Sequence, residues 1–204
     1  MICLARLIPY IIQPMIRPAT LTDYEAIAGI RQSLALDTTK LGDSVYVEQV
    51  QQDGFLVAVD INPETFAENV ANYIVGETDD GKIGGFLRLD NEQEMAHDEV
   101  PDWYNPYMAA VYWSLPHANI GKIAVLPSAT RQGLGTQMLA RAEQLTREKQ
   151  IPWLFAYVAY KPITNYASMG FHERNGFHQL ALEQPQSAYN MQDYQGMLYD
   201  KKLS

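Results

Sequence analysis

The fold of this chain is decided by the stretch IAVLPSATRQGLGT, residues 123–136. A short apolar, β-prone run ends at Pro127, a Gly-x-Gly turn follows at Gly133 and Gly135, and a long amphipathic pattern then begins. This order of strand, glycine turn and helix start gathers backbone N–H groups at the positive end of a helix dipole, where a phosphate group binds well. Glycine has no Cβ, so an anion can approach the main chain closely. The stretch therefore predicts a phosphate-binding loop.

Two common nucleotide motifs do not fit this loop. A dinucleotide-binding fingerprint needs a third glycine three residues after Gly135, and that position is Met138. A nucleoside-triphosphate loop needs Gly-Lys followed by Ser or Thr, which the chain lacks. Both classes of site are therefore excluded.

A second motif, NYASMGFHERNGF at residues 165–177, follows after a predicted helix and strand. Together the two motifs resemble the signature of the GNAT N-acyltransferase superfamily. Its first part is Val-x-Pro-x-x-Arg/Gln-x-x-Gly-x-Gly/Ala, and its second is Asn-x-x-Ala/Ser-x-x-Phe-Tyr/His-Glu-Lys/Arg-x-Gly-Phe. Thr130 departs from the first part, where the family usually has Arg or Gln, and the neighbouring Arg131 can supply charge. The resemblance covers residues 15–203.

Composition indicates a soluble globular chain, because 47% of its 204 residues are hydrophobic and 19% are charged. We expect a single family domain at 15–204 and an extension at 1–14 outside the resemblance. The extension is too short to span a membrane and is interrupted by prolines, and it lacks a signal-peptide cleavage site. The net charge of −9 argues against nucleic acid as a partner. The single cysteine, Cys3, indicates a cytoplasmic protein.

Hydrophobic periodicity, turns and capping signals predict alternating strands and helices. Strands are expected at 15–18, 73–77, 82–89, 107–115, 120–125, 153–160, 177–183 and 195–201, with a strand or extended loop at 54–59. Helices are expected from a capping box at 22–25, at 42–52, from an Asn cap at 62, and at 130–149 and 164–174. The sum is an α/β (α+β) fold with a mixed, twisted central sheet flanked by helices on both faces. In the resembled family, the strands near Val125 and Ala156 splay apart and admit a pantetheine arm.

The resemblance implies transfer of an acetyl group from acetyl-CoA to a primary amine of a small molecule or peptide, by direct attack in a ternary complex. The pantetheine amides are expected to pair with the backbone of Ile123, Ala124 and Val125 like an added strand. A main-chain N–H near Val125 is the expected oxyanion donor. The pyrophosphate is expected at the main-chain N–H groups of Arg131, Gln132, Gly133, Leu134, Gly135 and Thr136.

Asn165, Ser168 and His172 are spaced three and then four apart, which on a helix places them on one face. By resemblance, Asn165 and Ser168 contact the pantetheine arm. His172 holds the position of a Tyr that many relatives use to protonate the leaving thiolate. Imidazole, with a pKa of about 6.5, can do this if its surroundings keep it charged. A structural histidine that hydrogen-bonds the cofactor is the alternative.

The general base is expected in the region before the strand that ends at Val125. His117 is the first candidate, because it immediately precedes that strand, and Glu99 is the second. Glu94, His97 and Asp98 lie in the same region, and for each of these residues a solvated loop position is the alternative. An amphipathic or cationic amine would suit a pocket lined by a nearby aromatic cluster, unless that cluster packs in the core. Its members are Trp103, Tyr104, Tyr107, Tyr112 and Trp113.

Two other functions stay open at this point. One is a non-catalytic acetyl-CoA-binding sensor or interaction module, because a fold does not fix a function. The other is a protein lysine or N-terminal acetyltransferase, although the insertion at 90–115 favours a small acceptor. No metal is expected, because His172 and His178 are separated by an Asn-Gly cap and no cysteine assists them. A homodimer is compatible with the sequence.

Overall fold

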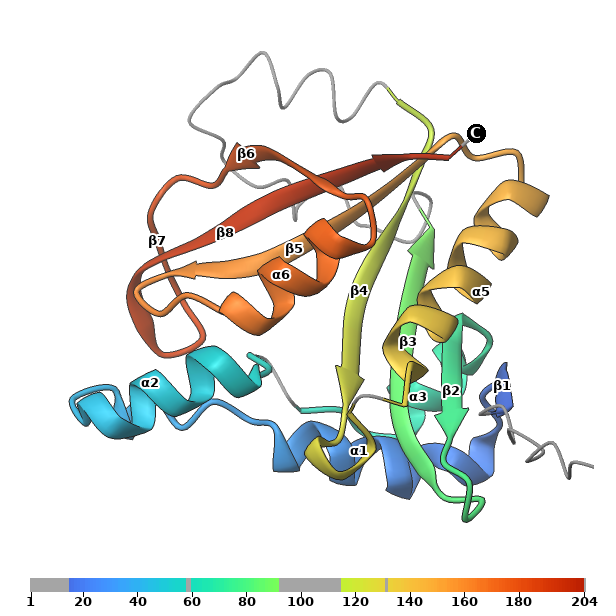
Figure 1. Cartoon of the computed structure of the whole chain (residues 1–204), viewed down its shortest axis with the longest axis horizontal. Coiled ribbons are helices and arrows are strands. Elements are labelled where there is room, and N and C mark those ends of the chain that lie inside the picture. Colours follow the sequence, from blue (N-terminus) through green and yellow to red (C-terminus); the bar gives the residue numbers. More distant parts are fainter. Residues whose placement is uncertain (1–14, 58–59, 92–114, 131, 204) are drawn as a thin grey trace, which may run out of the picture.

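The computed structural model describes residues 15–57, 60–91, 115–130 and 132–203. The strands are β1 (Met15–Pro18), β2 (Tyr73–Glu77), β3 (Ile83–Asn91), β4 (His117–Val125), β5 (Trp153–Lys161), β6 (His178–Leu182), β7 (Gln186–Ala188) and β8 (Met191–Lys202). The helices are α1 (Tyr24–Ser33), α2 (Ser44–Asp53), α3 (Pro63–Asn69), α5 (Leu134–Glu148) and α6 (Tyr166–Arg174). The expected fold class is confirmed, since a twisted mixed sheet carries helices on both faces (Figure 1).

The sheet has the strand order β1-β2-β3-β4-β5-β8-β6, and β7 pairs with β8 outside this path. β4 and β5 are parallel neighbours in the middle of the sheet. The other paired strands are antiparallel. Among the strands that the structure describes, two neighbours therefore run in the same direction only at the centre of the sheet.

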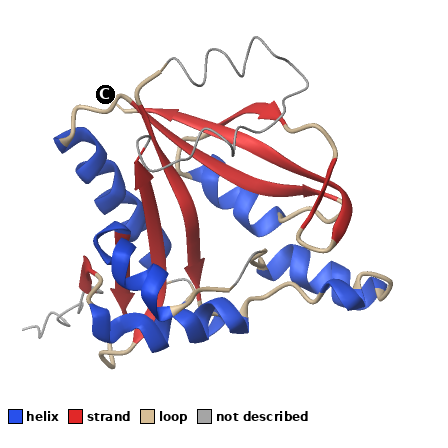
Figure 2. Cartoon of the chain, turned by 180° about the vertical axis from the view of Figure 1, so that it is seen from behind, coloured by secondary structure: helices blue, strands red, loops and turns tan. Residues whose placement is uncertain are grey.

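Two hydrophobic layers hold the sheet between its helices. On one face, Met138 and Leu139 of α5 pack with Leu87 of β3, and α6 covers the neighbouring part of the sheet (Figure 1). On the other face, Ile27 of α1 and Phe66 of α3 pack with residues of β2 to β4 (Figure 2). Burying these apolar faces on both sides is the main favourable contribution to such a fold.

Two glycines let the first turn of α5 lie close to the sheet. A Cβ added to Gly76 of β2 would stand 2.9 Å from the side chain of Leu134. A Cβ added to Gly84 of β3 would stand 3.1 Å from the side chain of Leu134 and 2.8 Å from that of Ala129, in the 3₁₀ turn before α5. Carbon atoms normally approach to about 3.5–4.0 Å, so larger residues would push the start of α5 away from the sheet.

The helix expected at 130–149 begins later, at Leu134. The residues Pro127–Ala129 form a 3₁₀ turn, and Gly133 has a φ of 76°, in the left-handed region. An α-helix cannot continue through a left-handed residue, so Gly133 becomes the N-cap. The predicted helix start at residue 130 was wrong because the spacing of apolar residues does not reveal the turn before α5.

The other boundaries differ in smaller ways. The capping box before α1 joins Thr20 and Asp23 rather than residues 22–25. The segment expected as a strand or loop at 54–59 makes one isolated bridge, Leu56 with Ala35, in its described part. The strand expected at 107–115 falls at positions 107–114 outside the described residues. The final hairpin contains the additional strand β7.

Candidate active site

β4 is paired on both sides in its first half and on one side in its second half. Its register with β5 runs from His117 opposite Trp153 to Ile120 opposite Ala156 and ends there. Its register with β3 continues to Val125. In the described part of the chain, the second half of β4 therefore faces an opening where β5 has moved away.

A bulge at Gly121 marks the point where the two strands part. Arg88 of β3 pairs with Lys122, while the next residue, Leu89, pairs with Ile120, so Gly121 is an extra residue in β4. A Cβ at this position would collide with the carboxylate of Asp90. A bulge bends its strand and increases the local twist, which accounts for the departure from β5.

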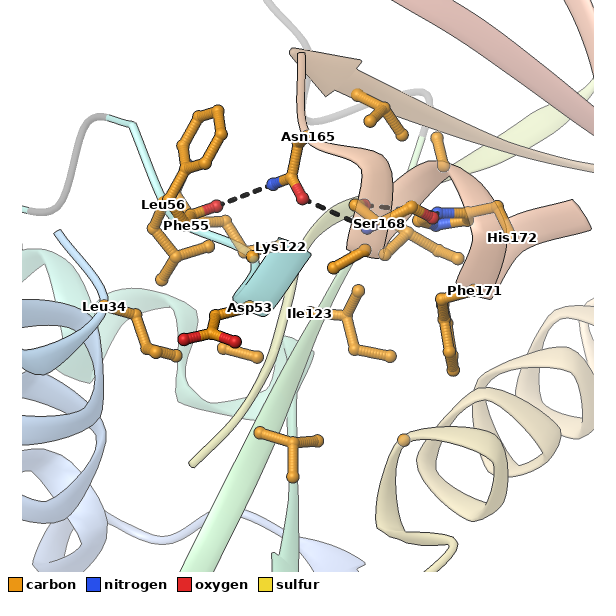
Figure 3. A pocket seen from close by; sticks show the side chains of 18 of the residues that line it. Leu34, Asp53, Phe55, Leu56, Lys122, Ile123, Asn165, Ser168, Phe171 and His172 are labelled. Atoms are coloured by element: carbon orange, nitrogen blue, oxygen red, sulfur yellow. Dashed lines mark hydrogen bonds between the residues drawn. The ribbon is translucent and has the colours of Figure 1, made fainter. Parts of the chain in front are cut away.

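The opening is part of a pocket of about 690 Å³ (Figure 3). The start of α5 lines one part of this pocket and the start of α6 lines another. Ten of the expected cofactor-contacting residues line it. They are Ile123, Ala124, Val125, Gly133, Leu134, Gly135, Thr136, Asn165, Ser168 and His172.

The glycine loop presents free main-chain donors to the pocket. The amide of Gln137 is hydrogen-bonded to the carbonyl of Gly133. The first N–H groups of an α-helix have no partner within the helix, which leaves those of Leu134, Gly135 and Thr136 for a ligand. Gln132 is exposed and is not among the residues that line the pocket.

Asn165 lies just before α6 rather than on its face, because its side chain caps the helix. Its Oδ1 accepts a hydrogen bond from the amide of Ser168 (3.0 Å). Its Nδ2 donates to the buried carbonyl of Phe55 (2.9 Å), and Figure 3 shows both bonds. The Asn165 amide is thus engaged within the protein at both ends, and it fixes the segment around Phe55 against α6.

His172 is buried, with 2% of its surface exposed, among the rings of Phe171, Phe177 and Tyr199. Its Nδ1 lies 2.8 Å from the carbonyl oxygen of Ser168. A carbonyl only accepts, so Nδ1 carries the proton and Nε2 is an acceptor. Burial lowers the pKa of His172 to about 4. The ring is therefore neutral at pH 7, and the structure favours a structural histidine over a charged proton donor.

His117 is not brought to the pocket. It begins β4, at the closed end of the strand, where it is fully buried against Phe155. Its Nδ1 lies 2.7 Å from the carbonyl oxygen of Leu115. His117 and Val125 lie at the two ends of β4. Nearness to this strand in the sequence therefore did not bring His117 to the pocket, which adjoins the end at Val125.

Several other expectations fall outside the described residues. Arg131 and the candidate base Glu99 are among them, as are the positions 94, 97 and 98 and the aromatic cluster at 103–113. In the ranges that the structure describes, no cluster of three or more metal-ligating side chains occurs. None of the described helices is both long and apolar enough to cross a membrane.

Lys122 is the main pocket residue that the sequence analysis missed. It lines the pocket, and its Nζ donates to the carbonyl of Val57 (2.9 Å). Burial, together with the nearby Arg31 and Arg88, lowers its pKa to about 8. The available signal was a lysine inside the otherwise apolar run at 120–125.

The comparison with protein families decides the assignment of this pocket. The model described as "Acetyltransferase (GNAT) family" matches residues 42–177, a range that contains both sequence motifs. The chain belongs to the GNAT acetyltransferase family. Membership implies acyltransferase activity.

Solved structures of GNAT proteins have the same fold. An N-acetyltransferase from Staphylococcus aureus Mu50 is 20% identical, with a TM-score of 0.60, and the match covers 94% of this chain and 99% of that one. The ribosomal-protein-S18-alanine N-acetyltransferase from Escherichia coli is 17% identical, with a TM-score of 0.59, covering 94% and 95%. A PaiA N-acetyltransferase from Thermoplasma acidophilum in complex with coenzyme A is 16% identical, with a TM-score of 0.57, covering 93% and 99%. No curated protein matched this GNAT chain.

Proposed function

We propose that this protein transfers the acetyl group of acetyl-CoA to a primary amine of a small molecule or peptide. The observation that carries the proposal is the opening between β4 and β5, which ends at the free N–H groups of the α5 start. A long ligand with an anionic end and an amide-rich arm fits such a passage. A GNAT structure crystallised with coenzyme A supports the choice of ligand.

In this proposal each part of acetyl-CoA has its own partner. The pyrophosphate binds the main-chain N–H groups from Arg131 to Thr136, Gln132 included. The pantetheine amides pair with the second half of β4 at Ile123–Val125, and Ser168 contacts the arm from α6. Asn165 acts indirectly, by capping α6 and holding the adjacent wall.

The chemistry is direct attack of a neutral amine on the thioester carbonyl. The N–C bond forms, the carbonyl oxygen becomes an oxyanion that the N–H near Val125 stabilises, and the C–S bond then breaks to release CoA thiolate. One proton must leave the amine and one must neutralise the thiolate. Glu99 remains the proposed base, and His172 is proposed as a neutral residue that shapes the cofactor side. We also propose that the protein acts in the cytoplasm, given its single cysteine.

A second candidate is a non-catalytic acetyl-CoA-binding module. It is favoured by Thr130, which replaces the family's Arg or Gln, and by the position of His117 away from the pocket. Both functions require acetyl-CoA binding, and only the first requires release of a thiol.

The test is calorimetric titration with acetyl-CoA, followed by a thiol-release assay on amines, amino acids and short peptides. Binding with release on one acceptor class supports the transferase and separates small acceptors from peptides. Binding without release on any acceptor would replace the transferase by the binding module. Absence of binding would remove both.

A further inference from the structure

A row of positive charge spans β3 and β4 on the α1 face of the sheet, with Arg31 of α1 beside it, and ends at the pocket. Tyr73 of β2 is paired with Arg88 of β3, and Arg88 is paired with Lys122 of β4. Residues directly opposite on neighbouring strands point to the same face. Arg31 of α1 lies near enough to both Arg88 and Lys122 to affect their ionisation. Three cationic side chains are thus gathered in one place.

The nearby carboxylates do not neutralise all of this charge. Asp90 is bound to Arg88, with 2.6 Å between Oδ1 and Nε. Asp60 acts on Arg31 and is exposed, and Asp53, which is also exposed, lines the same pocket. Lys122 forms no ion pair within the described residues, and its Nζ is bound to a carbonyl oxygen. Asp90 also lies close enough to Lys122 to favour its charged form, but it is bound to Arg88. Like charges on opposed residues destabilise a sheet, so Lys122, which has no ion pair of its own in the described part of the chain, can accept a further anion.

Lys122 is the member of this row that the pocket exposes. The bulge at Gly121 and the loss of pairing with β5 leave Lys122 beside the opening. Figure 3 shows it next to Phe55 and Leu56, on the other side of Ile123 from the cofactor-facing His172. An acceptor entering opposite the cofactor would therefore meet an ammonium group beside an apolar wall.

We propose that Lys122 binds a carboxylate on the acceptor, so that the substrate is an amine that carries its own carboxylate, as an α-amino acid does. This rests on the proposed acetyl transfer and specifies its acceptor. An ammonium group with no ion pair among the described residues can bind a carboxylate, and a hydrogen bond between charged groups contributes more than one between neutral groups. The chain is acidic overall, with a net charge of −9, so the local positive charge would distinguish this site from the rest of the molecule.

A purely structural role for Lys122 makes a different prediction. Its bond to the carbonyl of Val57 needs only an N–H donor, which a neutral side chain also supplies. Lys122→Gln keeps a donor and removes the charge, and Lys122→Glu reverses the charge. Lys82→Gln is the matched control, because Lys82 is 82% exposed in the β2–β3 turn.

The experiment measures kcat/KM of thiol release for a panel of α-amino acids and their C-terminal amides. We expect the wild-type protein to prefer the acids. The acid-to-amide ratio should fall by about tenfold or more in Lys122→Gln, invert in Lys122→Glu, and stay unchanged in Lys82→Gln. The same acids and amides are also titrated calorimetrically into protein saturated with CoA, a readout that does not need turnover.

The outcomes separate this proposal from the proposed function. Turnover with an equal acid-to-amide ratio in wild type and Lys122→Gln overturns the carboxylate site and keeps the transferase. Lys122-dependent binding of acids without turnover keeps the carboxylate site and removes the transferase. A wild-type protein that prefers amides, or binds no acid when loaded with CoA, overturns the carboxylate site even if neither variant folds.

Discussion

Both halves of β4 contribute residues to the core, but only the first half is paired with a strand on each side. In the first half, Ala118 and Ile120 lie in the core between two strand neighbours. In the second half, Ile123 and Val125 still pack against the same core, but the edge toward β5 is open to a pocket. The difference teaches that a strand becomes a binding edge here through the path of its neighbour and through a bulge, which moves the core-facing positions from Ala118 and Ile120 to Ile123 and Val125.

The largest expected effect concerns the anion-binding end of the open half. Gly133→Glu should weaken acetyl-CoA binding by at least about a hundredfold, because it brings a carboxylate to the donors proposed to bind pyrophosphate. Titration calorimetry measures the change. Gly81→Glu is the matched control, since Gly81 has a φ of 77° against 76° at Gly133 and has no atom near its Cβ position. Equal losses in the two variants would show that backbone strain alone is responsible.

The second largest effect is expected at the bulge between the two halves of β4. Gly121→Val should lower the free energy of unfolding by about 2–3 kcal/mol, because the added side chain meets the Asp90 carboxylate and strains the bulge. Urea denaturation measures it. Gly29→Ala, in the open surroundings of α1, should instead be neutral or slightly stabilising. An unchanged free energy of unfolding in Gly121→Val would contradict the close contact with Asp90 at the bulge.

His172, a buried residue at the pocket beside the open half of β4, gives a prediction about pH dependence. The folded pKa of His172 is lowered to about 4 from a usual value near 6.5. Between these values the unfolded chain binds a proton that the folded chain does not, so acidification through this window destabilises the fold, and the full stability is present above about pH 7. At pH 5 the cost is about 2 kcal/mol relative to pH 7.5. His172→Phe should lose this part of the pH dependence in thermal or urea unfolding, and an unchanged slope would contradict it.

The smallest effect compares two helix caps. Asn62 and Asn165 both accept a hydrogen bond from the amide three residues later, but only Asn165 also donates, to Phe55. Each Asn→Ala should cost about 1 kcal/mol for the cap, and Asn165→Ala about 1 kcal/mol more for the buried bond. Chemical denaturation measures both. Equal costs would show that the bond to Phe55 contributes nothing to holding the pocket wall.

The sequence predicted the fold class, and ten of the expected cofactor-contacting residues line one pocket, because the two motifs are local and each is tied to a helix start. It failed where the answer depends on distant pairing. His117 was chosen for its nearness to the β4 core, yet the strand carries it to the closed end. Lys122 was passed over because its importance comes from Arg88 and Arg31, on elements far away in sequence. The bulge at Gly121 depends on the register between β3 and β4, which the sequence of β4 alone does not fix.

The seating of α5 on Gly76 and Gly84 has a consequence for the cost of binding. These glycines belong to a hairpin about fifty residues before the loop, yet they hold its first helical turn against the sheet before any ligand arrives. A helix start that is already held in place loses little conformational freedom when an anion binds, so more of the interaction energy appears as affinity. The entropy of fixing this helix start is lost during folding, through contacts with two glycines that do not line the pocket.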